Sequence, residues 1–351
     1  MPTLIASIAK GACALICNVK RAALVLLSLF VLVACSGEAK HFIIHGETMG
    51  TTYQVTVLGD PEDKAVLAQE IDQLLLILND IASTYIEDSE LNQFNRAAIG
   101  EWHEVSPALY SMFEMALEVA WLSNGAFDIT VGPLVNAWGF GPMGRIEKRP
   151  NAIAQRELLA RVSYQHLELD LARQQVRKKQ DIEVDLSAIA KGYAVDELAA
   201  WIERRGYENY LVEIGGELRV AGESPRGNDW RVAIESPDAS EGVRAAIAVT
   251  DIAVATSGDY RNFYEEGGQR YSHTIDPRSG EPVQHDLASV TVLAETAAYA
   301  DALATAFSVM GTEKTLKLAE QEGIAVYLIH KQGDGFVSKA SSAFKPYEES
   351  L

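Results

Sequence analysis

Apolar and polar residues alternate along this chain with two periods, which predict a mixture of helices and strands. Helical spacing of the apolar residues marks residues 63–81, 106–123, 188–205, 297–310 and 312–322. Shorter apolar or alternating runs indicate strands at residues 42–44, 52–58, 182–186, 210–214, 217–221, 230–235, 246–249, 252–256, 289–293 and 324–329. Residues 128–142, rich in glycine and proline, are expected to form an ordered loop. No repeat or long linker divides these segments, so we expect an α+β fold: a single compact body of mixed, mostly antiparallel sheet with flanking helices.

The first 35 residues have the pattern of an export signal. Residues 22–34 are apolar, follow Lys20 and Arg21, and end at Cys35-Ser36-Gly37. So short an apolar stretch behind two positive charges is typical of a signal-peptide core rather than of a mature transmembrane helix. Leu32-Val33-Ala34-Cys35 resembles a bacterial lipobox, in which the cysteine is lipidated and becomes the new N-terminus. We expect residues 1–35 to be a lipoprotein signal peptide and residues 36–351 to be exported; the alternatives are a membrane anchor or a signal peptide in which Cys35 is incidental.

A second, weakly apolar stretch at residues 4–16 precedes this signal. A translation start at Val19 would give the compact basic beginning that signal peptides usually have. We therefore expect the natural precursor to begin near Val19.

Cysteine content and charge restrict the chemistry of the exported part. Cys13, Cys17 and Cys35 are the only cysteines, and none follows the expected cleavage site. Disulfides, cysteine-ligated zinc, iron–sulfur clusters and a cysteine nucleophile are thereby excluded there. The chain has 30 basic and 49 acidic residues, a net charge of −19. Nucleic acid is not an expected partner, and a phosphate ligand would need a metal cation or a helix N-terminus to offset the repulsion.

A predicted junction between a strand and a helix carries a lysine in an unusual position. Asp185 lies at the end of the strand, Ser187 is the expected helix cap, and Lys191 falls in the first helical turn. A cation near a helix N-terminus costs from a few tenths to about 1 kcal/mol, so Lys191 suits a site that an anion shares. The alternative is an ordinary capped helix with a solvated lysine.

His273 is the best candidate for a general base among the seven histidines. It follows a short extended stretch and precedes the turn signal Asp276-Pro277. The ordinary imidazole pKa near 6.5 suits proton transfer, although a lone histidine is more often structural.

Asp301 and Thr305 are four residues apart on a helix that is otherwise small and apolar. Their oxygens therefore face the same way. A carboxylate beside a hydroxyl, with no nitrogen or sulfur ligand, suits a hard cation such as Mg²⁺ better than zinc. The alternative is that Asp301 bonds a neighbouring backbone group and Thr305 the carbonyl one turn earlier.

These three segments, together with three others, resemble the ApbE family. The others are Met49-Gly50-Thr51-Thr52-Tyr53, Ser83-Thr84-Tyr85 with Asp88-Ser89-Glu90-Leu91, and Gly125-Ala126-Phe127-Asp128-Ile129-Thr130. The motifs occur in order from about Phe42 to Tyr347. Members of this family are FAD:protein FMN transferases, so the resemblance implies an enzyme with an ApbE or T-fold-like body over residues 36–351.

The resemblance also implies the roles of individual residues. FAD contacts are expected at Met49, Tyr85, Ala126, Phe127, Asp128, Asp185, Lys191 and Ile275. Mg²⁺ is expected at the backbone carbonyl of Ala188 and at the side chains of Asp301 and Thr305, the pair that helical spacing already selects. His273 is the expected catalytic base, assisted by Asp301.

The resemblance further implies the reaction and its protein partner. FMN would pass from FAD to a threonine or serine hydroxyl of an exported protein, in a short Ser/Thr-Gly-Ala-Thr-like motif, with release of AMP. Expected acceptors are subunits of Rnf-type or sodium-pumping NADH:quinone reductases. Two alternatives remain: an FAD pyrophosphatase that releases free FMN and AMP, and a non-catalytic FAD-binding lipoprotein.

The expected location follows from the anchor and the acceptors. We expect the chain at the periplasmic face of the membrane, anchored through lipid on Cys35. Respiratory acceptors favour the inner membrane. Ser36 is not the aspartate that commonly retains lipoproteins there, which leaves the outer membrane open.

Overall fold

The computed structural model describes residues 39–61, 63–141, 144, 149–238, 242–258, 263–266, 269–333 and 335–349. The predicted signal peptide and Cys35 lie outside the described residues. Within this part of the chain, no helix is both long enough and apolar enough to cross a membrane.

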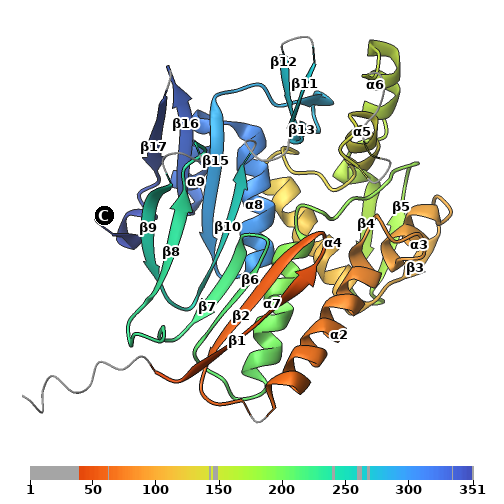
Figure 1. The fold of residues 1–351 in the computed structure, drawn as a ribbon. Coiled ribbons are helices and arrows are strands. Elements are labelled where there is room, and N and C mark those ends of the chain that lie inside the picture. Colours follow the sequence, from red (N-terminus) through yellow and green to blue (C-terminus); the bar gives the residue numbers. More distant parts are fainter. Residues whose placement is uncertain are drawn as a thin grey trace, which may run out of the picture.

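A large antiparallel sheet of eight strands forms the centre of the fold (Figure 1). Its strands follow one another in the order β1 (His41–Thr48), β2 (Thr51–Leu58), β6 (Tyr210–Ile214), β7 (Glu217–Ala221), β10 (Ile252–Gly258), β15 (Leu287–Ala294), β16 (Ala325–Gln332) and β17 (Gly335–Ala340). Each neighbouring pair is antiparallel. The predicted α+β fold with a mostly antiparallel sheet is therefore confirmed.

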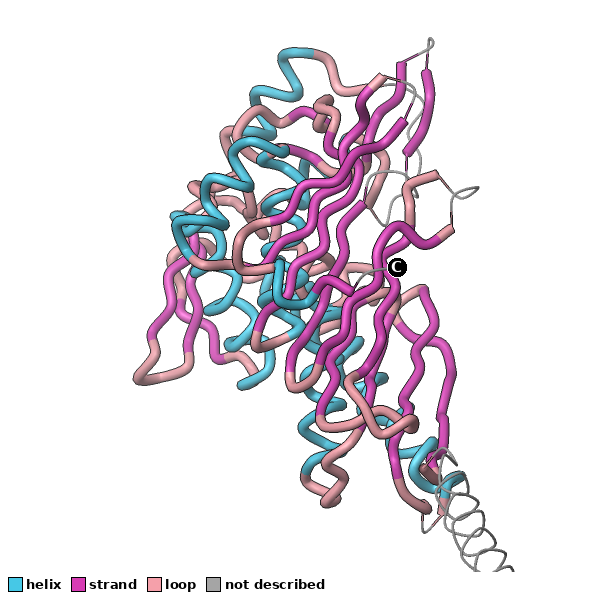
Figure 2. Tube along the Cα trace, turned by 90° about the vertical axis from the view of Figure 1, so that its left-hand side faces the viewer, coloured by secondary structure: helices cyan, strands magenta, loops and turns pink. Residues whose placement is uncertain are grey.

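Helices gather on one side of this sheet (Figure 2). They are α2 (Lys64–Ala82), α3 (Glu90–Arg96), α4 (Pro107–Leu122), α5 (Gly132–Ala137), α6 (Ala152–Leu159), α7 (Ala190–Glu203), α8 (Ala297–Met310) and α9 (Thr312–Glu322), with 3₁₀ turns η1 (Tyr164–His166) and η2 (Lys345–Tyr347). Among these, α7 and α8 pack directly on the sheet and on each other. These two helices bring Lys191 and Asp301 together.

Smaller sheets complete the body. They are β3 (Trp102–Glu104) with β5 (Gln175–Lys178) and β4 (Leu167–Asp170); β8 (Trp230–Glu235) with β9 (Val243–Val249) and β18 (Glu348–Glu349); β11 (Phe263–Glu266) with β12 (Gln269–Ser272); and β13 (Ile275–Asp276) with β14 (Glu281–Pro282). Apolar side chains of β8 and β9 pack against the face of the large sheet that the helices leave uncovered.

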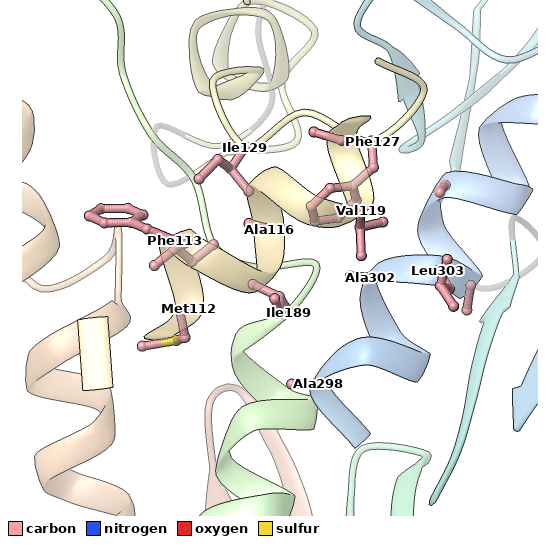
Figure 3. Packing of buried hydrophobic residues seen from close by; sticks show 14 of the residues in the cluster. Met112, Phe113, Ala116, Val119, Phe127, Ile129, Ile189, Ala298, Ala302 and Leu303 are labelled. Carbon is pink, nitrogen blue, oxygen red and sulfur yellow. The ribbon is translucent and has the colours of Figure 1, made fainter. Parts of the chain in front are cut away.

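The main core lies where α4, α8 and the start of α7 meet. Figure 3 shows this packing, with side chains from Met112, Phe113, Ala116, Val119, Phe127, Ile129, Ile189, Ala298, Ala302 and Leu303. Small residues let the helices approach closely. A Cβ atom on Gly192 would come within 2.3 Å of the carbonyl oxygen of Ala297, so no larger residue fits there without moving α7 or α8.

Several predicted elements are confirmed and a few are wrong. The strands β6, β7 and β8 and the helices α8 and α9 have the predicted bounds. The predicted strand at residues 182–186 forms only an isolated bridge from Glu183 to Val131. A side chain takes the place of a neighbouring strand there. The N–H of Val184 donates to Oδ1 of Asn95, and Nδ2 of Asn95 donates to the carbonyl of Val184.

Helix boundaries near the site also differ from the prediction. Helix α7 begins at Ala190, and Ser187 does not cap it. The N–H of Ser187 donates to Oδ1 of Asp185, 2.8 Å away, which makes a turn that delays the helix. The expected loop at residues 128–142 contains α5, and the expected turn at Ser257-Gly258 belongs to β10.

Candidate active site

One cavity of about 940 Å³ lies beside helix α8 and the strands β7, β10 and β15 of the large sheet. Segments far apart in the sequence supply its walls. The predicted site residues that line it are Tyr85, Ala126, Phe127, Asp128, Asp185, Ala188, Lys191, His273, Ile275, Asp301 and Thr305. The structure therefore brings together nearly all of the residues that were predicted to form the site.

Met49 lies beside the cavity rather than in its lining. It occupies the turn between β1 and β2 with a φ of 49°, and its side chain packs on the core beneath α2 and α7. The adjoining residues Gly50 and Thr51 do line the cavity. An FAD contact at Met49 stays a prediction.

Lys191 joins two buried carboxylates at the base of the cavity. Its Nζ atom lies 3.4 Å from Oε2 of Glu217 and 3.5 Å from Oδ2 of Asp301. Burial alone would lower the pKa of Lys191, but the charges of Asp301 and Glu217 outweigh it and raise that pKa. Lys191 therefore stays positively charged in the site. The prediction that an anion shares the site with Lys191 requires this positive charge.

Sequence reasoning missed Glu217, the first residue of β7. Glu217 is 4% exposed, and burial raises the pKa of its carboxyl to about 8, with Lys191 opposing that shift and Asp301 adding to it. Its Oε2 atom accepts no hydrogen bond of good geometry from the described residues, although Lys191 is close. The one signal in the sequence was a glutamate directly after Gly215-Gly216, at the start of a predicted strand.

Asp301 is held by the close packing of α7 on α8. The backbone N–H of Gly192 donates to its Oδ2 atom at 3.2 Å, the oxygen that also faces Lys191. The Oδ1 atom makes neither contact. Thr305 lines the same cavity one turn further along α8. Ala188 lines this cavity as well. A cation held by these three residues stays a prediction.

Two other predicted site residues, Asp128 and Asp185, shape the loops around the cavity. Asp128 accepts hydrogen bonds from the N–H and the hydroxyl of Thr130 and from the N–H of Tyr164, at 2.7–2.8 Å. Burial raises the pKa of Asp128, although these hydrogen bonds oppose the shift. Asp185 similarly accepts from Ser187. Both side chains therefore position the backbone that lines the cavity.

His273 lies between β12 and β13 and lines the cavity. The ring of Phe140 meets its imidazole edge-on, with centroids 6.3 Å apart. Ile275, two residues later, is buried in a small cluster with Trp138 and Tyr271. At the rim, Tyr85 is 68% exposed, so its ring is available to a ligand. The cavity thus combines a general-base candidate, one fixed cation, carboxylates and an aromatic rim.

The comparisons with known proteins identify the family of this chain. The model of the ApbE family matches residues 49–328. The chain belongs to the ApbE family. An enzyme of Haemophilus influenzae named FAD:protein FMN transferase is 42% identical over 327 residues, which cover 91% of this chain and 94% of that one. A namesake from Vibrio cholerae is 44% identical over 329 residues, covering 92% and 97%.

Solved structures show the same fold. The flavin transferase ApbE from Vibrio cholerae has a TM-score of 0.82 at 42% identity, covering 88% of this chain and 99% of that one. The apo flavinyl transferase ApbE from Pseudomonas stutzeri has a TM-score of 0.81 at 40% identity, covering 88% and 96%. The predictions of the family, the fold class and an enzyme of the transferase class are confirmed.

Proposed function

We propose that this enzyme transfers FMN from FAD to a threonine or serine hydroxyl of an exported protein, with Mg²⁺ bound and AMP as the leaving product. One observation carries the proposal: a single cavity holds the cation Lys191, the oxygen pair Asp301 and Thr305, and the base candidate His273. The relatives named FAD:protein FMN transferase support the flavin donor and the protein acceptor.

The oxygen atoms around Asp301 fit Mg²⁺. Its Oδ1 atom is not used by Lys191 or Gly192, Thr305 adds a hydroxyl, and Ala188 adds a backbone carbonyl on the same cavity. Hard oxygen donors with few protein carboxylates are what Mg²⁺ prefers beside a phosphate ligand. When bound, the ion would neutralise charge on the FAD pyrophosphate.

The chain's own residues supply the other parts of the reaction. The acceptor oxygen attacks the phosphorus nearer the riboflavin, and the bond from that phosphorus to the bridging oxygen breaks, so that AMP leaves with the bridging oxygen. His273 accepts the proton of the attacking hydroxyl, assisted by Asp301. Lys191 and the N-terminus of α7 stabilise the negative charge of the departing AMP.

The acceptor and the location complete the proposal. We propose an exported acceptor such as a subunit of an Rnf-type or sodium-pumping NADH:quinone reductase. The lipobox-like segment supports anchoring of the enzyme through lipid on Cys35 at the periplasmic face of the membrane. Tethering would raise its effective concentration near membrane-bound acceptors.

The decisive experiment weighs the acceptor. The detergent-solubilised chain is incubated with FAD, Mg²⁺ and the flavin-carrying domain of such a reductase subunit, and the acceptor is analysed by intact mass spectrometry. A gain equal to one FMN supports transfer. An unchanged acceptor with free FMN and AMP would instead identify an FAD pyrophosphatase, and unchanged FAD would identify a binding protein. Omitting Mg²⁺ or adding EDTA should stop the reaction.

A further inference from the structure

The cavity reaches both faces of the large sheet. Neighbouring residues of a strand point to opposite faces, and β7 supplies two of them to the cavity lining, Glu217 and Leu218. Glu217 faces the helices, where it meets Lys191, whereas Leu218 belongs to the apolar cluster on the other face. The cavity therefore has an inner lobe beside α7 and α8 and an outer lobe between the large sheet and β8.

The two lobes meet over the turn Gly215-Gly216, which joins β6 to β7. Both glycines line the cavity, and a Cβ atom added to Gly216 would meet nothing within 4 Å. Strand β7 pairs with β10 up to Leu218↔Val254, whereas β10 continues along β15 as far as Gly258. Strand β10 thus extends beyond the turn, and the open space above the glycines connects the lobes.

The outer lobe is an apolar pocket with one pair of hydroxyl groups. Thr256 and Thr291 face each other on β10 and β15, with their hydroxyl oxygens 2.9 Å apart. Both threonines line the cavity, and strand alternation places Thr256 on the same face as Val254. The lobe is lined by Leu218, Val232, Ile234, Val254, Thr256 and Thr291.

Charge distinguishes the two lobes. Among the described residues that line the cavity, Lys191 of the inner lobe is the only lysine or arginine. Glu213 lies directly opposite Leu218 in the strand pair β6–β7, and its carboxylate accepts a hydrogen bond from the N–H of Gly216 at 2.7 Å. A diphosphate is therefore favoured beside Lys191 and disfavoured beside Glu213. The outer lobe suits an uncharged polypeptide segment instead.

We propose that the hydroxyl residue of the acceptor protein enters through the outer lobe and passes over Gly215-Gly216, while FAD occupies the inner lobe. This inference rests on the proposed FMN transfer. In phosphoryl transfer the attacking and leaving oxygens lie roughly in line, on opposite sides of the phosphorus. Because Lys191 stabilises the departing AMP from the inner lobe, the acceptor must approach from the other side, and the outer lobe provides that route.

Thr256 is the residue of the outer lobe that recognises the acceptor. Thr291 is 1% exposed, whereas Thr256 is partly exposed to the cavity. When the hydroxyl of Thr291 donates to that of Thr256, Thr256 keeps its own hydrogen and can donate it to a backbone carbonyl of the acceptor. Small apolar groups of the acceptor would pack on Leu218 and Val254 below.

Removing the Thr256 hydroxyl separates acceptor binding from FAD binding. Thr256→Val keeps nearly the same volume, and the loss of one hydrogen bond should raise the acceptor KM about fivefold while the Kd for FAD stays unchanged. Thr256→Ser, which keeps a hydroxyl, should restore the wild-type KM. The matched control is Thr56→Val on β2, which removes a buried hydroxyl outside the cavity lining and should leave the KM unchanged.

Alkylation of single cysteines locates each ligand directly. Cys13, Cys17 and Cys35 are the chain's only cysteines, so their replacement by serine gives a background for Thr256→Cys in the outer lobe and Ser187→Cys beside the start of α7. N-ethylmaleimide addition is followed by intact mass. The probes are FAD with Mg²⁺, and the acceptor domain with alanine in place of its modified residue. FAD should slow alkylation of Ser187→Cys but not of Thr256→Cys, and the acceptor domain should slow that of Thr256→Cys.

The contrary outcomes are distinct. Protection of Thr256→Cys by FAD, or a weaker Kd for FAD in Thr256→Val, would assign the outer lobe to the flavin and overturn the proposal. An unchanged acceptor KM in Thr256→Val would also overturn it, provided that wild-type enzyme adds FMN to the acceptor. Wild-type enzyme that releases FMN and AMP without modifying the acceptor would instead refute the proposed function itself.

Discussion

The ammonium group of Lys191 lies 3.5 Å from Oδ2 of Asp301, across the contact between α7 and α8. The pair sits at the base of the cavity, where the Asp301 side chain is 7% exposed. Lys191 thus contacts one carboxylate oxygen of Asp301, and the other oxygen can bind a cation or accept a proton. This arrangement allows one carboxylate to serve both the proposed Mg²⁺ site and the catalytic base.

Replacement of Asp301 by asparagine should abolish turnover. The change keeps the side-chain volume but removes the negative charge that the proposed Mg²⁺ site needs, so we expect AMP release to fall about 10²- to 10³-fold or more. The measurement is AMP release with FAD and Mg²⁺. Glu313→Gln, which alters an 85% exposed side chain on α9, should keep wild-type turnover. Full activity in Asp301→Asn would refute this metal site.

Lys191 and Glu217 should be strongly coupled in a double-mutant cycle. Lys191→Met leaves buried Asp301 and Glu217 without the cation that they share, so we expect a loss of about 3 kcal/mol in unfolding free energy. Adding Glu217→Gln should restore part of it, with a coupling energy of about 1–3 kcal/mol from denaturant unfolding. The exposed pair Lys339 and Glu313, 2.9 Å apart, is the control and should couple by less than about 1 kcal/mol. Additive losses at Lys191 and Glu217 would contradict the pairing.

Local signals in the sequence predict most elements but not the contacts between them. Helix α8 has the bounds predicted from helical spacing, and the structure shows that local effects set them, because Thr296 caps the helix and Gly311 ends it. Helix α5 was missed because its Gly132-Pro133 start indicates a turn as readily as a helix. The bridge from Asn95 to Val184 joins positions far apart in sequence, so no local pattern could show that it replaces strand pairing.

The same difference between local signals and contacts in the folded chain applies to the candidate site. Lys191, His273 and Asp301 were found because each stands in a distinctive local pattern that also resembles a family motif. Glu217 was missed because its burial depends on β7 being covered by α7 and by its neighbouring strands, a property of the assembled fold. For Asp128, the structure adds that its carboxylate binds Thr130 and Tyr164, and the FAD contact that the resemblance implies stays a prediction.

Gly192→Ala should impair both stability and activity. Its Cβ atom would lie 2.3 Å from the carbonyl oxygen of Ala297, so α7 and α8 must separate, and Lys191 with them from Asp301. Overpacking of this kind costs about 1–3 kcal/mol of unfolding free energy, and AMP release should fall as well. Gly335→Ala is the matched control, because nothing lies within 4 Å of its added Cβ. Equal behaviour of the two variants in thermal unfolding and turnover would show that the helix contact does not hold the site.

The raised pKa of Glu217 should appear as a pH-dependent stability. The folded protein holds this carboxyl's proton up to a pH of about 8, whereas an unfolded glutamate releases it near its ordinary pKa of 4.5. Between these values the folded state binds more protons, so the unfolding free energy contributed by Glu217 falls as the pH rises from about 4.5 to 8. Glu217→Gln lacks this loss, so its unfolding free energy should rise relative to that of wild type over that range. The measurement is urea unfolding in EDTA at pH values of about 5, 6.5 and 8. A constant difference between the two proteins would mean that Glu217 is ionised in the folded state throughout.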